Sequence, residues 1–271
     1  MQRAKQRLNE ELDRLLNYLD PSSERVLIST FLKEYVENHA LTLLQMENSG
    51  LVAMIKNEKY EELALMYELF SKVSDSFTQL NKHLFNHITT EGGKLTADKQ
   101  LKPDEFVSHI ITLREKMLNI HLKSFNRDST IELTIKTAFE QFLNVEGGEK
   151  TAMSLVYYLD DQFKKELARL SEAEIGERLD RVIKIFRYLQ DKDIFEGYYK
   201  NSLANRLLDQ RTNSSSNGGN ILEDTEKLLV LKLKEECGFQ FTQKLEVMFK
   251  DIKMSEDTMS EFRATSLSKQ L

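Results

Sequence analysis

The chain has 271 residues, a formal net charge of −6 at pH 7 and a single cysteine, Cys237. The negative charge argues against non-specific nucleic-acid binding, which needs a basic excess. One cysteine excludes an internal disulfide and fits a reducing, intracellular setting. No apolar run reaches the roughly 20 residues of a membrane span, and the sequence shows no secretion signal.

The first half of the sequence predicts a series of helices separated by short breaks. Glycine and proline together number only 12 residues (10 Gly and 2 Pro), which leaves little turn chemistry. Apolar spacing predicts a first helix over 2–19. Asp20 is a good N-cap, and Pro21 suits the first position of the next helix, which runs through Phe31, Leu32 and Tyr35 before a break at "ENSG". Further helices are expected around 51–55, from Tyr60 to Phe70, and from Phe77 to Ile88.

Gly92 and Gly93 are expected to end the helix that contains Ile88. A long helix is then predicted from the "KPDE" segment to Phe125, and another from Ile131 to Leu143. No strand-like alternation persists anywhere in the sequence. The predicted fold class is therefore all-α.

The segment "VEGGEK", residues 145–150, is the best candidate for a domain boundary. We therefore expect one helical unit over 1–147 and a second over 148–271. The segment "QRTNSSSNGGN" consists of polar residues and glycine, which cannot bury a core, so we expect a mobile surface loop over 210–222. The helices expected in the second unit cover 151–167, 172–189, 192–209, 223–236 and 240–252, followed by a tail.

The segment "DKDIFEGYYKNSLANRLL", residues 191–208, predicts an amphipathic helix. Its apolar face repeats every fourth residue through Phe195, Tyr199, Leu203 and Leu207. We expect Leu208 to flank this face, together with Ile194, Tyr198 and Ala204. The charged residues Lys192, Glu196, Lys200 and Arg206 are expected mostly toward water.

No residue pattern predicts a catalytic, metal or cofactor site. His83 and His87 have the spacing of a metal-binding pair on a helix, but no third ligand accompanies them, so a solvated or partly buried pair is favoured. Asp160 and Asp161 are neighbours on a helix and therefore diverge, unlike a catalytic acid and base. Cys237 precedes Gly238 at a predicted helix end, which favours a half-buried structural cysteine over a nucleophile.

The segments "FRYLQDKDIFEGYYKNSLANRLL" and "KLKEECGFQFTQKLEVMFKDI" resemble the cullin family. The segments "YLDPSSE" and "AFEQFLN" agree with the last cullin repeat, while "MENSGLV" and "TMSEFR" are closest to the cullin-3 branch. Asn205 and Gly197 depart from the usual family pattern. The core residues of the family motif are Phe186, Asp193, Phe195, Tyr199, Leu203, Leu207, Leu208, Cys237, Gly238, Leu245, Met248 and Phe249.

The resemblance implies a segment of a longer protein, with the last cullin repeat over 1–147 and a four-helix bundle over 148–271. It implies a rigid, non-catalytic scaffold of a RING-type ubiquitin ligase, working in the cytoplasm and nucleus without a cofactor. The implied partners are a RING-finger protein, a BTB-domain substrate adaptor and a ubiquitin-like modifier, with their main sites outside this segment.

Two alternatives to this function stay open. The chain could be another helical scaffold, either the cullin-like subunit of the anaphase-promoting complex or a cullin-repeat-like tethering protein; the "DKD" and "MFKDI" motifs speak against the tethering proteins. It could also be a ligase or other enzyme that uses Cys237 as its nucleophile.

Overall fold

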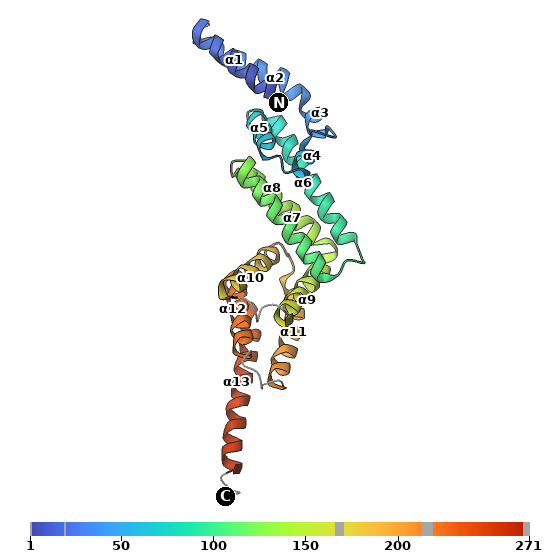
Figure 1. The fold of residues 1–271 in the computed structure, drawn as a ribbon, viewed down its shortest axis with the longest axis vertical. Helices are drawn as coiled ribbons and strands as arrows, with labels where there is room; N and C mark the ends of the chain where they lie inside the picture. Colours follow the sequence, from blue (N-terminus) through green and yellow to red (C-terminus); the bar gives the residue numbers. More distant parts are fainter. Residues whose placement is uncertain (1, 19, 166–170, 213–218, 268–271) are drawn as a thin grey trace. The chain divides into compact units, whose positions relative to one another are not determined.

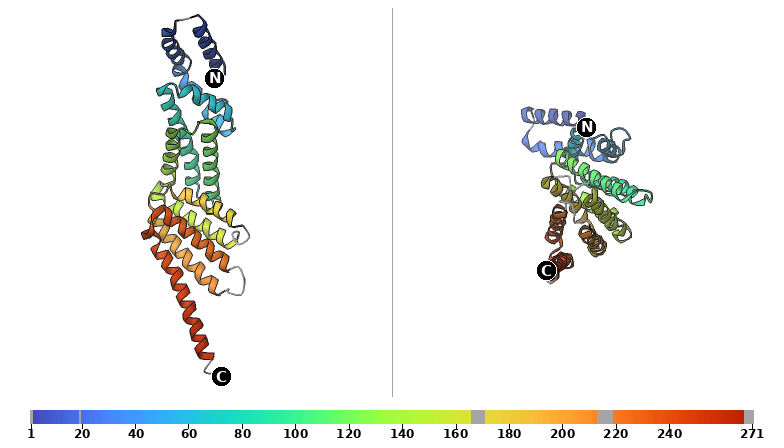
Figure 2. Two further views of the ribbon diagram at one scale, coloured as in Figure 1. Left: turned by 90° about the vertical axis from the view of Figure 1, so that its left-hand side faces the viewer. Right: turned by 60° about the horizontal axis from the view of Figure 1, so that its bottom comes forward.

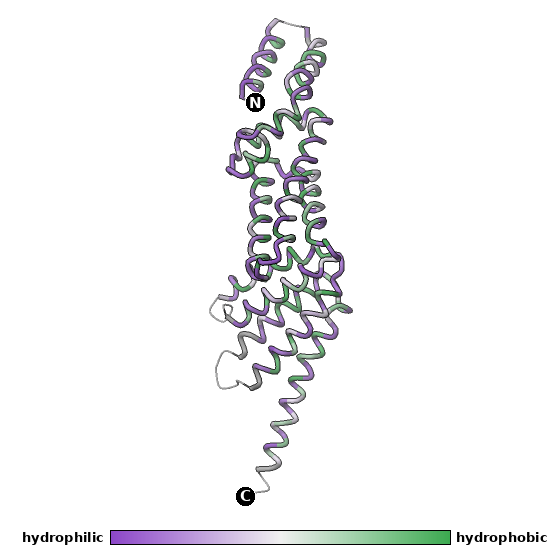
Figure 3. Tube along the Cα trace, turned by 90° about the vertical axis from the view of Figure 1, so that its right-hand side faces the viewer, coloured by the Kyte–Doolittle hydropathy of each residue, from purple (hydrophilic) through white to green (hydrophobic). Residues whose placement is uncertain are grey.

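The computed structural model describes residues 2–18, 20–165, 171–212 and 219–267 (Figure 1). Every regular element among these residues is helical, which confirms the predicted all-α class. None of the helices in the described ranges is both long and apolar enough to cross a membrane. Figure 3 shows apolar and polar residues sharing the same helices, as amphipathic packing requires.

Eight α-helices and two 3₁₀ turns lie between residues 2 and 143 of the described chain. The elements are α1 (Gln2–Tyr18), η1 (Pro21–Ser23), α2 (Glu24–Tyr35), η2 (Glu37–His39), α3 (Ala40–Gln45), α4 (Leu51–Lys56), α5 (Tyr60–Phe70), α6 (Ser74–Ala97), α7 (Pro103–Ser124) and α8 (Ser129–Leu143). The short elements η2 and α3 have no counterpart in the sequence prediction.

The remaining elements are η3 (Val145–Gly148), α9 (Glu149–Lys165), α10 (Glu172–Phe186), α11 (Lys192–Thr212), α12 (Gly219–Cys237) and α13 (Phe239–Leu267). The predicted tail after residue 252 is wrong, because α13 continues to Leu267 without a glycine or proline to end it. The predicted loop over 210–222 is wrong at both ends, where α11 and α12 extend into it. Residues 213–218, its centre, lie outside the described residues.

Polar side chains begin several of these helices. The Asp20 carboxylate accepts the Ser22 backbone N–H at 2.9 Å and so starts η1, one turn before α2. Asp128 accepts the backbone N–H groups of Thr130 (2.8 Å) and Ile131 (3.1 Å) at the start of α8. Ser171 and Glu174 form a capping box at α10. Each cap gives a partner to backbone N–H groups that the helix itself leaves unpaired.

The described chain divides into two compact units. The first unit contains residues 1–97 and 112–142, and the second contains residues 98–111 and 143–271. The chain therefore passes between the units at 97–98, within α7, and at 142–143. The single domain boundary at 147–148 stays a prediction.

The first unit is built from α1–α6, the second half of α7 and most of α8. Helices α1 and α2 form an antiparallel pair, drawn in dark blue in Figure 2. The core of α6 is a row of buried leucine and isoleucine side chains at Leu80, Leu84 and Ile88, one turn apart. Gly92 continues this row, so the prediction that the helix ends there is wrong: Gly92 lies inside α6, and the Phe142 ring occupies the space that a side chain at 92 would need.

The second unit is built around α9–α13. Helix α11 lies against α9 and α13, and α12 lies against α10 and α13, as the left view of Figure 2 shows. All five helices contribute buried apolar side chains to the unit, among them Leu155, Val182, Leu203, Leu229 and Leu245. The sequence motifs at 186–208 and 232–252 thus belong to helices that pack together.

Candidate functional site

The predicted motif residues fall into three groups by exposure. Those buried in the structure are Phe186, Phe195, Tyr199, Leu203, Leu207 and Leu245. Those partly exposed are Cys237, Met248 and Phe249. Asp193, Leu208 and Gly238 are exposed. The expectation that Leu208 flanks the buried face of α11 is wrong, because this side chain is 56% exposed.

Four aromatic rings form a continuous chain of contacts across the second unit. The Phe186 ring of α10 lies 4.8 Å from Phe195 of α11 and 6.0 Å from Phe241 of α13, between ring centroids. Phe195 stacks on Tyr199 one turn further along α11, with centroids 5.6 Å apart. Three helices are therefore joined by one aromatic series.

Tyr199 ends this series at a buried ionic group. Its hydroxyl donates to Glu226 Oε2 of α12 at 2.7 Å. Arg206 of α11 donates to the same carboxylate through Nε and, at 3.2 Å, through Nη2. The side chains of Arg206 and Glu226 are only 5% and 1% exposed. The pair is thus removed from water and held by two parallel charge-assisted hydrogen bonds.

The same guanidinium also reaches α9. Arg206 Nη1 donates to Asp160 Oδ1 at 2.7 Å and to Ser202 Oγ at 2.8 Å, and Ser202 donates to Asp160 at 2.9 Å. The second oxygen of Asp160 accepts Lys164 Nζ at 2.6 Å. We call Asp160, Tyr199, Ser202, Arg206 and Glu226 the Arg206 cluster. It connects α9, α11 and α12 through polar groups that satisfy one another.

The surroundings of the cluster shift the pKa of its members. Burial raises the pKa of Tyr199 well above its usual range, and the adjacent Glu226 carboxylate raises it further. Burial alone would lower the pKa of Arg206, but the charge of Glu226 outweighs it and raises that pKa. Burial alone would likewise raise the pKa of Asp160, and hydrogen bonds from Lys164, Arg206 and Ser202 lower it instead. The shifted pKa values of Arg206 and Asp160 both favour their ionised forms.

The burial of Arg206 corrects the expectation that it faces water. Arg206 follows Tyr199 by seven residues, or about two turns, so both lie on one face of α11. Leu208 follows Tyr199 by nine residues and lies on the opposite side, because each residue turns the helix by about 100°. The helical spacing therefore predicts that Arg206 lies on the buried face of α11. The expectation that it faces water rests on its charge.

The predicted boundary segment 145–150 forms a tight turn within the second unit. Gly147 and Gly148 have φ values of 74° and 75°, a left-handed conformation that glycine adopts without strain. Just before the turn, the Asn144 side chain donates to the Tyr188 carbonyl at 2.7 Å and accepts the Gln190 N–H at 2.9 Å. Asn144 thereby ties the start of α9 to the connection between α10 and α11.

Comparison with known proteins places these helices in a family. The model described as "Cullin alpha solenoid domain" matches residues 1–259. The chain belongs to the cullin family. Among curated relatives, "Cullin-3A" of Arabidopsis thaliana is 40% identical over 264 residues, covering 97% of this chain and 35% of the relative.

The other cullin relatives agree with this assignment. "Cullin-3" of Dictyostelium discoideum is 38% identical over 258 residues (94% of this chain, 32% of the relative), and "Cullin-4" of the same organism is 31% identical over 263 residues (97% and 31%). The chain therefore spans about a third of the length of the curated relatives that it matches. The cullin-3 relatives confirm the branch that the sequence segments indicate.

The cysteine of the cullin motif lies at the end of α12. Gly238 follows it with φ +84°, and its N–H donates to the Lys234 carbonyl at 2.8 Å, which confirms the predicted glycine cap. Burial raises the pKa of the Cys237 thiol, and the carboxylates of Glu236 and Asp193 add to this effect. The surroundings therefore disfavour the thiolate that a nucleophilic cysteine needs.

The remaining sequence candidates occupy ordinary positions in this cullin segment. His83 and His87 lie on α6, partly buried, and burial lowers the pKa of His87. Asp160 belongs to the Arg206 cluster. No group of three or more potential metal ligands occurs among the described side chains.

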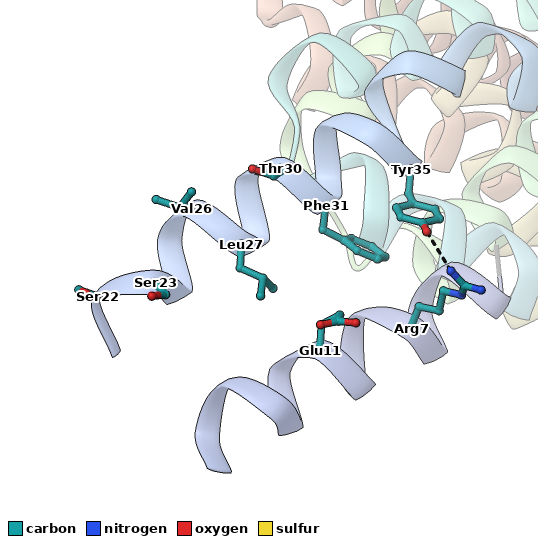
Figure 4. A pocket seen from close by; sticks show the side chains of 9 residues that line it. All are labelled: Arg7, Glu11, Ser22, Ser23, Val26, Leu27, Thr30, Phe31 and Tyr35. Atoms are coloured by element: carbon teal, nitrogen blue, oxygen red, sulfur yellow. Dashed lines mark hydrogen bonds between the residues drawn. The ribbon is translucent and has the colours of Figure 1, made fainter. Parts of the chain in front are cut away.

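An open groove of about 690 Å³ separates α1 from α2 (Figure 4). Leu27 and Phe31 of α2 point into it, and Arg7 of α1 donates to the Tyr35 hydroxyl at 3.0 Å at one end. Among the described residues that line it, Glu11 is the only carboxylate, so these residues do not provide the paired groups of an acid–base site.

Proposed function

We propose that this chain is a non-catalytic scaffold segment of a cullin-RING ubiquitin ligase. Cullins are scaffolds of such ligases, and the family match over residues 1–259 is the observation that carries the proposal. In the whole protein, the segment links the end that holds the substrate adaptor to the end that holds the RING protein. Its contribution is to keep substrate and ubiquitin-conjugating enzyme at a high effective concentration.

The packing of the second unit supports a mechanical role. Aromatic contacts and the Arg206 cluster link α9–α13 through buried side chains, and satisfied buried polar groups rigidify a core. Helices joined in this way keep their ends at a fixed separation. The raised pKa of Cys237 gives no support to thiol catalysis.

The proposed partners follow from the cullin-3 branch. They are a RING-finger protein, a BTB-domain substrate adaptor and a ubiquitin-like modifier, and we propose that each has its main site outside residues 1–271. The chain covers 35% of "Cullin-3A", which leaves the larger part of such a protein for these contacts. We propose that the assembly works in the cytoplasm and nucleus.

The test is a reconstituted ubiquitylation assay with two forms of the protein. The full-length protein, with RING partner and adaptor, is expected to transfer ubiquitin to an adaptor-bound substrate. The 271-residue chain alone is expected to transfer none and to bind neither partner stably. Transfer by the 271-residue chain alone would contradict a scaffold role, and inactivity of the full-length protein with every cullin-3-type adaptor tested would contradict the proposed partners.

A further inference from the structure

The apolar face of α11 does not by itself fix how the hairpin of α12 and α13 aligns along the axis of α11. Phe195, Tyr199, Leu203 and Leu207 repeat at every fourth residue of α11. Helix α12 packs on α13, and Gly238 alone connects the two, so they would move together as one hairpin. On α13, which contacts α11, Phe241, Leu245 and Phe249 are also four residues apart. A shift of this hairpin by one turn, about 5.4 Å, would therefore bring apolar residues opposite apolar residues of α11 again.

The Arg206 cluster distinguishes these alignments. The planar guanidinium meets the Glu226 carboxylate through two N–H groups, while a third nitrogen is held by Asp160 and Ser202 on its other side. A one-turn shift of α12 would carry Glu226 out of reach. Arg206 would then lose its buried partner, which is far more costly than a change of apolar neighbours.

We propose that the buried Arg206–Glu226 pair specifies the axial register of α12 against α11, with Asp160 extending the same constraint to α9. Removing two charges from water costs about as much as their attraction returns, so the pair adds little net stability compared with apolar residues of similar size. The pair instead raises the free energy of other registers, because they would leave Arg206 without its buried partner. This inference is independent of the proposed function.

The decisive variant replaces the polar pair by apolar residues. Arg206→Met and Glu226→Leu remove both charges, and Tyr199→Phe removes the hydroxyl that would otherwise lose its acceptor. Asp160 keeps Lys164 and Ser202 as partners. Two spin labels, at cysteines placed at Leu208 and Leu231, report the distance between α11 and α12, because these side chains are 56% and 52% exposed. Cys237→Ser prevents a third label.

We expect one narrow distance distribution in the parent chain. In the triple variant we expect a folded, helical protein with a second distance population, displaced by about one helical turn of α12, or about 5 Å along its axis. Tyr199→Phe alone should keep the single population. Arg187→Met with Glu236→Leu is the matched control, because it removes an Arg–Glu pair between α10 and α12 whose arginine is 58% exposed.

Three results would overturn the proposal. A triple variant that folds with the parent's single distance would show that the apolar packing alone sets the register. A triple variant that fails to fold, while the control pair folds, would show that the charges supply stability that apolar residues cannot replace. A second population in the control pair would show that any lost ion pair loosens the helices.

Discussion

The ring of Phe142 lies so close to Gly92 that a Cβ atom added to this glycine would stand 2.4 Å from it. Gly92 is in the interior of α6 and is buried, and Phe142 near the end of α8 is 2% exposed. The neighbouring Gly93 has open space where its Cβ would be. The two adjacent glycines thus have opposite roles: one makes room for a buried ring, and the other only weakens its helix.

Alanine substitutions at these two positions should have opposite signs. We expect Gly92→Ala to lower the free energy of unfolding by about 1–3 kcal/mol, as overpacked cores do. Gly93→Ala should raise it by about 0.5–1 kcal/mol, because alanine favours the helix. Urea unfolding of both variants measures the difference. Equal effects of the same sign would mean that Phe142 does not pack on Gly92.

The buried face of α11 makes a second pair of substitutions informative. Leu203 is fully buried, so Leu203→Ala should lower the free energy of unfolding by about 2–5 kcal/mol. Lys200 is exposed, and Lys200→Ala should change it by less than about 0.5 kcal/mol. Chemical denaturation tests both, and comparable losses would show that the assigned helix face is wrong.

Asp128 should make stability depend on pH in the acid range. Burial alone would raise its pKa, but hydrogen bonds from Ile131, Tyr67 and Thr130 outweigh this and lower it. A lowered folded-state pKa means that this stabilisation is complete above the ordinary aspartate value of about 3.9 and is lost as pH falls through the folded-state value.

We therefore expect Asp128→Ala to cost about 0.5–2 kcal/mol at pH 7, as the loss of a helix cap does, and less near pH 3. Tyr67→Phe removes one of the hydrogen bonds to Asp128, at 2.9 Å, and should reduce the same pH dependence only in part. Urea midpoints measured between pH 7 and pH 3 show how the stability of each variant depends on pH. If the difference in the free energy of unfolding between the parent and Asp128→Ala stays constant with pH, this role for the carboxylate is ruled out.

Cys237 should react slowly with thiol reagents in the native chain. Burial raises the pKa of its thiol, so little thiolate is present at neutral pH, and the rate should increase only as pH rises beyond the ordinary cysteine value of about 8.5. A cysteine introduced at Leu208, which is 56% exposed, supplies the fast reference in a Cys237→Ser background. A Cys237 rate equal to this reference at pH 7 would revive the interpretation as a catalytic thiol.

Helical spacing alone predicts most of the fold, because each helix buries a face with a period near 3.6 residues. Helical spacing also predicts that Arg206, two turns after Tyr199, faces inward. What it lacks is the partner: nothing near Arg206 in sequence shows that Glu226, 20 residues later, will meet it in the core. A charged residue without a visible partner is assigned to solvent by default.

The misplaced helix ends have a similar origin. Gly92 and Gly93 carry a local signal for termination, but α6 continues through both. The contact with Phe142, 50 residues further along the chain, gives Gly92 a packing role that the local sequence does not show. The sequence does favour the extension of α13 to Leu267, because no glycine or proline follows Gly238 to end the helix. Its apolar residues Met254 and Phe262 are 67% and 66% exposed, so burial does not mark this part of the helix.

The scaffold account is tested most directly by loosening the chain between Gly147 and Gly148 in the full-length protein. A flexible glycine-serine insert there should lower the rate of ubiquitin transfer to an adaptor-bound substrate while the adaptor binding constant stays unchanged, because slack reduces effective concentration without altering either contact. The same insert placed within 213–218 is the control and should leave both values near those of the parent. An unchanged transfer rate with the insert at 147–148 would contradict the claim that the tight turn between α8 and α9 contributes to a rigid connection.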